Sequence, residues 1–209
     1  MKKKDIIYKS IMRLLPLIVA IPIFSCSSPS AKAPQDVDPY PVKYENELFS
    51  FSLPKGWEFD DSGWQGLDSM RNEVDFYKPD DALVWFHFVK TYFPIQWKNI
   101  GEATEFAKAA RAMSTDNAQL IDEVDSVTIS GYPSSVLMFA NFVGNDTIIQ
   151  KQFVTYIQEN HTLLYFNENF FFRNWDEGQH IGDKLMQTLF IKEFVNPIDE
   201  RHKKEADKE

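Results

Sequence analysis

The stretch ALVWFHFVKTY, residues 82–92, predicts a β-strand that is hydrophobic on both of its faces. Because side chains alternate along a strand, Trp85 and Val89 fall on one face, and Phe86 and Phe88 fall on the other. A strand of this kind is covered on both sides. We therefore expect residues 82–92 to be a central strand of a sheet that lies between two layers.

Further strands and two helices are predicted on either side of this stretch. The expected strands are residues 48–53, 57–59, 73–77, 120–129, 135–143, 147–158, 162–166 and 190–191. The expected helices are residues 102–113 and 175–188, and Asn174 with Glu177 resembles a capping box at the start of the second. Short turns between successive strands indicate antiparallel neighbours. The predicted fold class is α+β, an antiparallel sheet with helical cover.

The N-terminus has the parts of an export signal. Lysines at residues 2–4 precede residues 14–24, an uncharged run shorter than the roughly 20 residues that span a bilayer. The order IFSC at residues 23–26 resembles the lipobox of bacterial lipoproteins, in which the signal peptide is cut before a cysteine that then carries lipid. We predict a signal peptide over residues 1–25 and lipidation of Cys26. The alternative is an ordinary secretory signal followed by a free thiol.

This reading places the protein in the cell envelope of a Gram-negative bacterium, anchored by lipid to the outer or the inner membrane. The chain has a net charge of −9, and removal of the basic residues 1–25 makes the rest more acidic. Such a charge argues against nucleic acid as a partner and against electrostatic adhesion to anionic lipid. Residues 26–47 are rich in Ser, Pro and Asp and predict a lipid anchor and flexible tether. The domain is expected over residues 48–193, followed by a charged, disordered tail over residues 194–209.

Two motifs resemble those of PsbP-like domains. The segment FSFSLPKGW, residues 49–57, is similar to the family's opening strand and turn. The segment ISGYPS, residues 129–134, is similar to its I-x-G-x-P-A turn, with Ser134 where Ala is common. The resemblance covers residues 48–192 and implies an α/β/α sandwich around a twisted antiparallel sheet. It also implies a mainly non-catalytic protein, because the family shares no catalytic motif to carry over.

The residues themselves indicate no enzyme. The sequence has no Gly-rich phosphate loop and no G-x-S-x-G elbow, so we predict no catalytic residue and no cofactor. Asp176, His180 and Asp183 fall near one another on the second predicted helix and are candidate ligands for a metal ion. The alternative is a solvated helix face with an ordinary ion pair, which the nearby Lys184 favours.

Two loops carry large hydrophobic side chains that a protein partner could bind, namely Trp64, Leu67, Met70, Phe93 and Trp97. The alternative for each is that it folds back onto the sheet. Three D-[ST]-apolar triplets resemble the acceptor of a periplasmic O-glycosylation system, and they make Ser69, Ser126 and Thr147 candidate acceptors.

Together these patterns predict a membrane-tethered envelope lipoprotein. Its domain is expected to bind a protein partner or to assist assembly without catalysing a reaction. The alternative is a protein that binds a small molecule or a metal, or an enzyme, with a cleft near His180.

Overall fold

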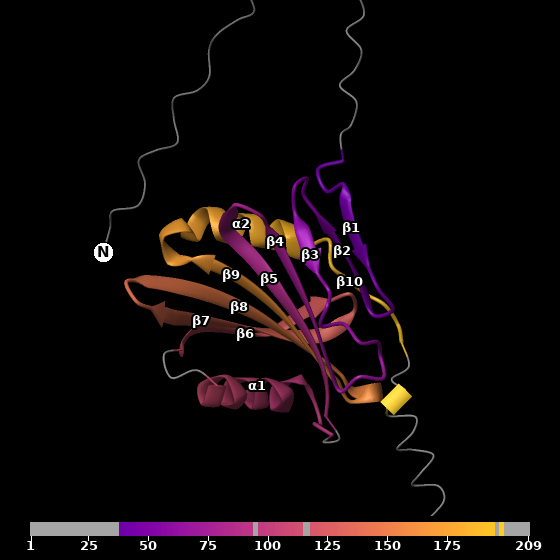
Figure 1. Ribbon diagram of the computed structural model, residues 1–209. Helices are drawn as coiled ribbons and strands as arrows, with labels where there is room; N and C mark the ends of the chain where they lie inside the picture. Colours follow the sequence, from indigo (N-terminus) through magenta and orange to yellow (C-terminus); the bar gives the residue numbers. More distant parts are fainter. Residues whose placement is uncertain (1–37, 94–95, 115–117, 195–196, 199–209) are drawn as a thin grey trace, which may run out of the picture. The chain divides into compact units, whose positions relative to one another are not determined.

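The computed structural model describes residues 38–93, 96–114, 118–194 and 197–198 (Figure 1). A seven-stranded sheet has the order β3-β4-β5-β9-β8-β7-β6, with antiparallel neighbours throughout, and a three-stranded sheet has the order β1-β2-β10. The strands are β1 Val42–Glu45, β2 Phe49–Leu53, β3 Glu58–Asp60, β4 Arg71–Lys78, β5 Asp81–Tyr92, β6 Ala118–Ile129, β7 Tyr132–Val143, β8 Asp146–Ile157, β9 Thr162–Phe171 and β10 Phe190–Ile191. The helices are α1 Ile100–Ser114 and α2 Trp175–Met186, with 3-10 turns η1 Gln158–Asn160 and η2 Phe172–Asn174.

The hydrophobic stretch at residues 82–92 forms most of β5, which is an interior strand, as predicted. It pairs with β4 on one side and with β9 on the other. Phe86 and Phe88 are fully buried on one face, whereas Trp85 and His87 are half-buried on the other. The face of β5 that carries Phe86 and Phe88 is therefore covered more completely than the face that carries Trp85 and His87.

One face of the large sheet is covered by the three-stranded sheet together with α2 (Figure 1). Alternate residues of β2 are buried, and the ring of Phe51 lies 5.0 Å from that of Phe76 and 5.1 Å from that of Phe166. Aromatic pairs at this spacing add to the free energy of burial. This core is the larger of the two hydrophobic clusters of the described residues.

The opposite face is covered by α1, which lies against β7 and β8 (Figure 1). Ala103 and Ala107 are buried and bring the helix close to Leu137 and Val154 of the sheet. The sheet thus has helical cover on both faces, in agreement with the predicted α+β class and broadly with the sandwich. The sequence did not indicate the separate three-stranded sheet, in which β10 pairs with β2.

The folded part begins and ends outside the predicted limits of 48 and 193. Residues 42–45, assigned to the tether, form β1 against β2, and Tyr44 is buried in the main core. At the other end Phe194 packs on the core and Ile198 is buried. These short segments were predicted as tether and tail because the prolines and polar residues around them obscure their hydrophobic pattern. Residues 1–25, Cys26 and residues 199–209 lie outside the described residues.

Two local predictions are also corrected. β9 continues through Asn167, Glu168 and Asn169 and is therefore longer than the predicted strand over residues 162–166. The three polar side chains are buried in the sheet, although their polarity in the sequence indicated a loop. Asn174 makes no capping hydrogen bond through its side chain, since the chain enters α2 from η2. No helix in the described ranges has the length and hydrophobicity needed to cross a bilayer.

Candidate functional site

A buried lysine of the sheet binds the backbone of the loop between β3 and β4, residues 61–70. The side chain of Lys90, on β5, is fully buried, and its Nζ donates hydrogen bonds to the carbonyl oxygens of Leu67 at 2.7 Å and Ser69 at 2.6 Å. Burial lowers the pKa of Lys90 to about 8, and the carboxylate of Asp68 opposes this shift. Lys90 therefore joins the sheet to the end of the loop.

A second buried polar side chain holds the middle of the same loop. Asn72 Nδ2 donates to the carbonyl oxygen of Gly66 at 2.7 Å, and Asn72 Oδ1 accepts the backbone N–H of Gln65 at 2.7 Å. Gly66 has a φ of 92°, a conformation that glycine adopts without the strain of a side chain. Lys90 and Asn72 together therefore hold the loop backbone at four of its residues, Gln65, Gly66, Leu67 and Ser69.

The loop presents its hydrophobic side chains unequally. Trp64 and Leu67 are half-buried and pack against the main core, and Trp64 Nε1 donates to Glu47 Oε2 at 2.9 Å. Met70 is 52% exposed. The structure thus brings these three predicted partner residues onto one ordered loop, with Met70 as the most open of them.

The other two predicted partner residues belong to the core under α1. Trp97 is only 8% exposed, with ring contacts to Phe93 at 5.3 Å, Phe106 at 5.1 Å and Tyr156 at 5.1 Å. Phe93 is half-buried in the same cluster. These aromatic residues fold back onto the sheet, so Trp97 offers little surface to a partner.

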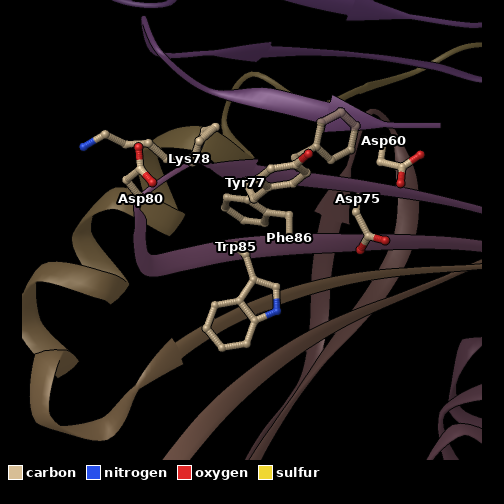
Figure 2. A pocket seen from close by; sticks show the side chains of 9 residues that line it. Asp60, Asp75, Tyr77, Lys78, Asp80, Trp85 and Phe86 are labelled. Atoms are coloured by element: carbon tan, nitrogen blue, oxygen red, sulfur yellow. The ribbon is translucent and has the colours of Figure 1, made fainter.

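A hollow of about 650 Å³ lies beside the β4–β5 hairpin (Figure 2). Aromatic and acidic side chains dominate its wall, which is formed by Asp60, Asp75, Phe76, Tyr77, Lys78, Pro79, Asp80, Trp85 and Phe86. The hairpin is irregular here, because the pairing shifts between Phe76 and Lys78 and Asp80 has a φ of 64°. No pattern along the sequence indicates this hollow, because its residues come from three strands and a turn.

A polar row crosses the sheet next to this hollow. Asp60, Asp75 and His87 lie opposite one another on β3, β4 and β5. His87 Nδ1 and Asp75 Oδ1 are 2.8 Å apart, and His87 Nε2 lies 3.8 Å from Glu73 Oε2. The histidine is thus flanked by two carboxylates, and the rim of the hollow is acidic.

The three predicted metal ligands do not form a metal site. His180 and Asp176 are exposed on α2, and the carboxylate of Asp183 forms an ion pair with Lys151 of β8. Across the described residues, no three side chains of the His, Cys, Asp or Glu type are grouped so that they could hold a metal ion. Nor does the hollow of about 440 Å³ beside α2 include His180, although Asp183 is part of its wall.

The ion pair of Lys151 lies above a buried carboxyl group. Glu168 of β9 is fully buried, with one carboxylate oxygen 4.0 Å from Lys151 Nζ. Burial raises the pKa of Glu168 to about 8, more than Lys151 lowers it. Gly182 of α2 makes the space for this group, because a Cβ at that position would lie 1.6 Å from Glu168 Oε1.

The candidate O-glycosylation acceptors differ in accessibility. Ser69 donates its hydroxyl to the carbonyl oxygen of Arg71 at 2.7 Å. Thr147 is half-buried near the start of β8, whereas Ser126 is exposed on β6 within the register shift between Val124 and Val127. Modification of these residues remains a prediction.

The architecture described above is similar to that of a solved PsbP structure. No family model and no curated protein matches the sequence. Among solved structures, cyanobacterial PsbP from Synechocystis sp. PCC 6803 is similar with a TM-score of 0.55 and 16% identity, over 79% of this chain and 100% of that one. This likeness shows the fold.

Two further structures are similar at lower scores. LpqN of Mycobacterium tuberculosis, described as involved in cell envelope biogenesis, has a TM-score of 0.49 and 12% identity over 69% of this chain and 83% of that one. The Ran-binding protein Mog1p of Saccharomyces cerevisiae has a TM-score of 0.43 and 10% identity over 68% of this chain and 89% of that one.

Proposed function

We propose that this protein is a lipid-anchored envelope protein whose PsbP-like domain binds a protein partner without catalysing a reaction. The export signal and Cys26 supply the anchor, and the prolines and polar residues after it supply a tether. The acidic chain has little attraction for anionic lipid by itself, so the lipid would hold the domain near its partner.

The observation that supports binding most directly is the ordered loop at residues 61–70. Its backbone is held by Lys90 and Asn72, so little conformational entropy is lost when a partner binds. Met70 is exposed on the same loop as Trp64, and both residue types are enriched at protein interfaces. The loop is therefore the surface on which we expect the partner to dock.

The test compares two methionine substitutions in the full chain. Met70→Asp places a charge in the proposed interface, and Met113→Asp makes the same change on α1, where Met113 is 80% exposed. Each tagged protein is cross-linked in membranes, solubilised in detergent and purified. We expect a stoichiometric partner with the parent protein and with Met113→Asp, and about tenfold less captured partner with Met70→Asp.

Two results would contradict the proposal. One is equal capture by both variants at equal unfolding midpoints, which would remove the loop from the interface. The other is the absence of any reproducible partner of the parent protein, which would remove the binding function itself.

A second candidate function is the binding of a small organic cation in the hollow beside the β4–β5 hairpin. The carboxylates of Asp75 and Asp80 and the rings of Tyr77 and Trp85 lie around it (Figure 2). Aromatic faces and carboxylates both attract cations, and a quaternary ammonium ion is the chemistry that such a wall recognises.

Calorimetric titration with benzyltrimethylammonium tests this candidate. Trp85→Leu should weaken binding by about tenfold or more, whereas Trp175→Leu, at a similarly half-buried tryptophan on α2, should leave it unchanged. No heat of binding with the parent protein would reject the small-molecule function for this class of ligand.

A further inference from the structure

One edge of the seven-stranded sheet is long and open. β6 is the last strand in the sheet order and pairs only with β7, among the strands that the structure describes (Figure 1). It has 12 residues, whereas the strand at the opposite edge, β3, has 3. The outward N–H and C=O groups of such an edge are able to pair with another extended chain.

The side chains of β6 are hydrophobic and acidic. Leu120, Ile121 and Val124 are 40%, 44% and 46% exposed. Asp122 and Asp125 are exposed as well, and the strand contains no lysine or arginine. Its neighbour β7 contains no charged residue, and Glu123 of β6 pairs with Lys108 of α1, so Asp122 and Asp125 carry the negative charge of this edge.

These features disfavour a second copy of the same strand as the occupant. Pairing of two β6 strands would bring carboxylates of like charge together, which is destabilising. The register also shifts between Leu120 and Asp122 and between Val124 and Val127. Bulges and charges on an edge strand are known means of blocking pairing between identical edges. The same negative charge attracts a strand of opposite charge.

We propose that β6 receives an extended, basic segment of a partner protein as an eighth strand of the sheet. Main-chain hydrogen bonds to β6 would supply affinity, and lysine or arginine side chains facing Asp122 and Asp125 would supply specificity. Hydrophobic side chains on the other face of the segment would cover the exposed Leu120, because Leu120 and Asp122 pair with adjacent residues of β7 and so lie on opposite faces. This inference rests on the proposed binding function and states the chemistry of the partner.

A synthetic peptide serves as the probe. It is blocked at both ends and alternates lysine with valine over about ten residues, the length of a long strand. One control peptide alternates glutamate with valine, and another has the lysines and valines in two blocks. We expect the alternating basic peptide alone to bind the full chain, with slower amide hydrogen exchange along β6.

Two double variants locate the site. Asp122→Lys/Asp125→Lys reverses the charge of the β6 edge and should weaken the basic peptide by about tenfold or more while creating affinity for the acidic peptide. Glu58→Lys/Glu177→Lys makes the same change in net charge at exposed residues of β3 and α2 and should change neither affinity.

Several results would overturn the inference. Equal losses in the two double variants would show attraction by net charge alone. No protection along β6 would exclude strand addition, and a dimer of the parent protein that is lost in Asp122→Lys/Asp125→Lys would make a second copy the occupant. A partner captured equally by the parent protein and Asp122→Lys/Asp125→Lys would refute the edge site but leave the proposed binding function intact. Peptide binding at β6 with no captured partner would support the edge site but contradict the proposed binding function.

Discussion

Lys90 is a buried cation whose role is to shape the surface above it. Its Nζ is bonded to the carbonyl oxygens of Leu67 and Ser69, so removal of the ammonium leaves two loop acceptors without their donor. We expect Lys90→Met to speed amide exchange in residues 61–70 about tenfold, equivalent to about 1.4 kcal/mol of local stability. Lys98→Met, at a side chain that is 86% exposed, serves as the control. Unchanged exchange in the loop would mean that Lys90 does not hold it.

The depressed pKa of Lys90 also predicts a pH dependence. Between about pH 8 and pH 10.5 the lysine of the unfolded chain binds a proton that the buried lysine has released. The free energy of unfolding therefore rises with pH across this window through Lys90. Chemical denaturation at several pH values should show this rise in the parent protein and its loss in Lys90→Met.

Glu168 predicts the opposite trend in a lower pH window. Its pKa is raised from 4.5 to about 8, so the folded protein retains a proton that the unfolded chain loses. This contribution to stability is complete below pH 4.5 and is lost as the pH rises through about 8. We expect Glu168→Gln, which stays neutral, to flatten the pH profile of the unfolding midpoint. Parallel profiles for the two proteins would mean that Glu168 is ionised in the folded state.

At the scale of elements, two glycines set the distance between α2 and the sheet. A Cβ at Gly182 would overlap the carboxyl group of Glu168, and one at Gly178 would lie 2.7 Å from Phe170 Cγ. Alanine in an exposed helix normally stabilises by about 1 kcal/mol relative to glycine, whereas overpacking costs about 1–3 kcal/mol. We expect Gly182→Ala to destabilise by about that overpacking cost, measured by denaturant unfolding.

A second substitution tests whether the overlap is the cause. Glu168→Ala opens space under residue 182, so the double variant should lose less stability than the sum of the two single variants. Additive losses would place the effect of Gly182→Ala elsewhere, in the helix or in the unfolded chain.

At the scale of the whole molecule, one covalent modification is expected to decide where the domain resides. Each buried CH₂ of an acyl chain contributes about 0.8 kcal/mol, and stable attachment needs two chains. Cys26→Ala should therefore accumulate as an unprocessed precursor that a palmitate analogue does not label, whereas Ser27→Ala should mature and label normally. Gel mobility and labelling measure both, and normal labelling of Cys26→Ala would refute the anchor.

The elements with strong periodicity could be predicted from the sequence. Both faces of residues 82–92 are hydrophobic, so β5 was expected inside the sheet, and α1 was expected from its stripe of small and aromatic residues. β1 was not predicted because its four residues are too few to show the alternation of hydrophobic and polar side chains that indicates a strand. The end of β9 was missed because Asn167, Glu168 and Asn169 are buried polar residues, which local patterns assign to loops.

The candidate site was predicted only in part. The loop with Trp64, Leu67 and Met70 was identified from its composition, but Trp97 proved to be a core residue under α1. The support given by Lys90 joins residues more than 20 positions apart, and the acidic hollow gathers three strands and a turn. The spacing of residues in the sequence does not indicate such long-range contacts.

The sequence by itself determined the fold class, the interior strand and the acidic charge, because hydrophobic periodicity and composition are local properties of the chain. Only the tertiary structure decided which loop is rigid, which aromatic residues are covered and which edge of the sheet is open. Each of these depends on what packs against a residue from a distant part of the chain, and a pattern of side chains shows that a face is hydrophobic without showing what lies on it.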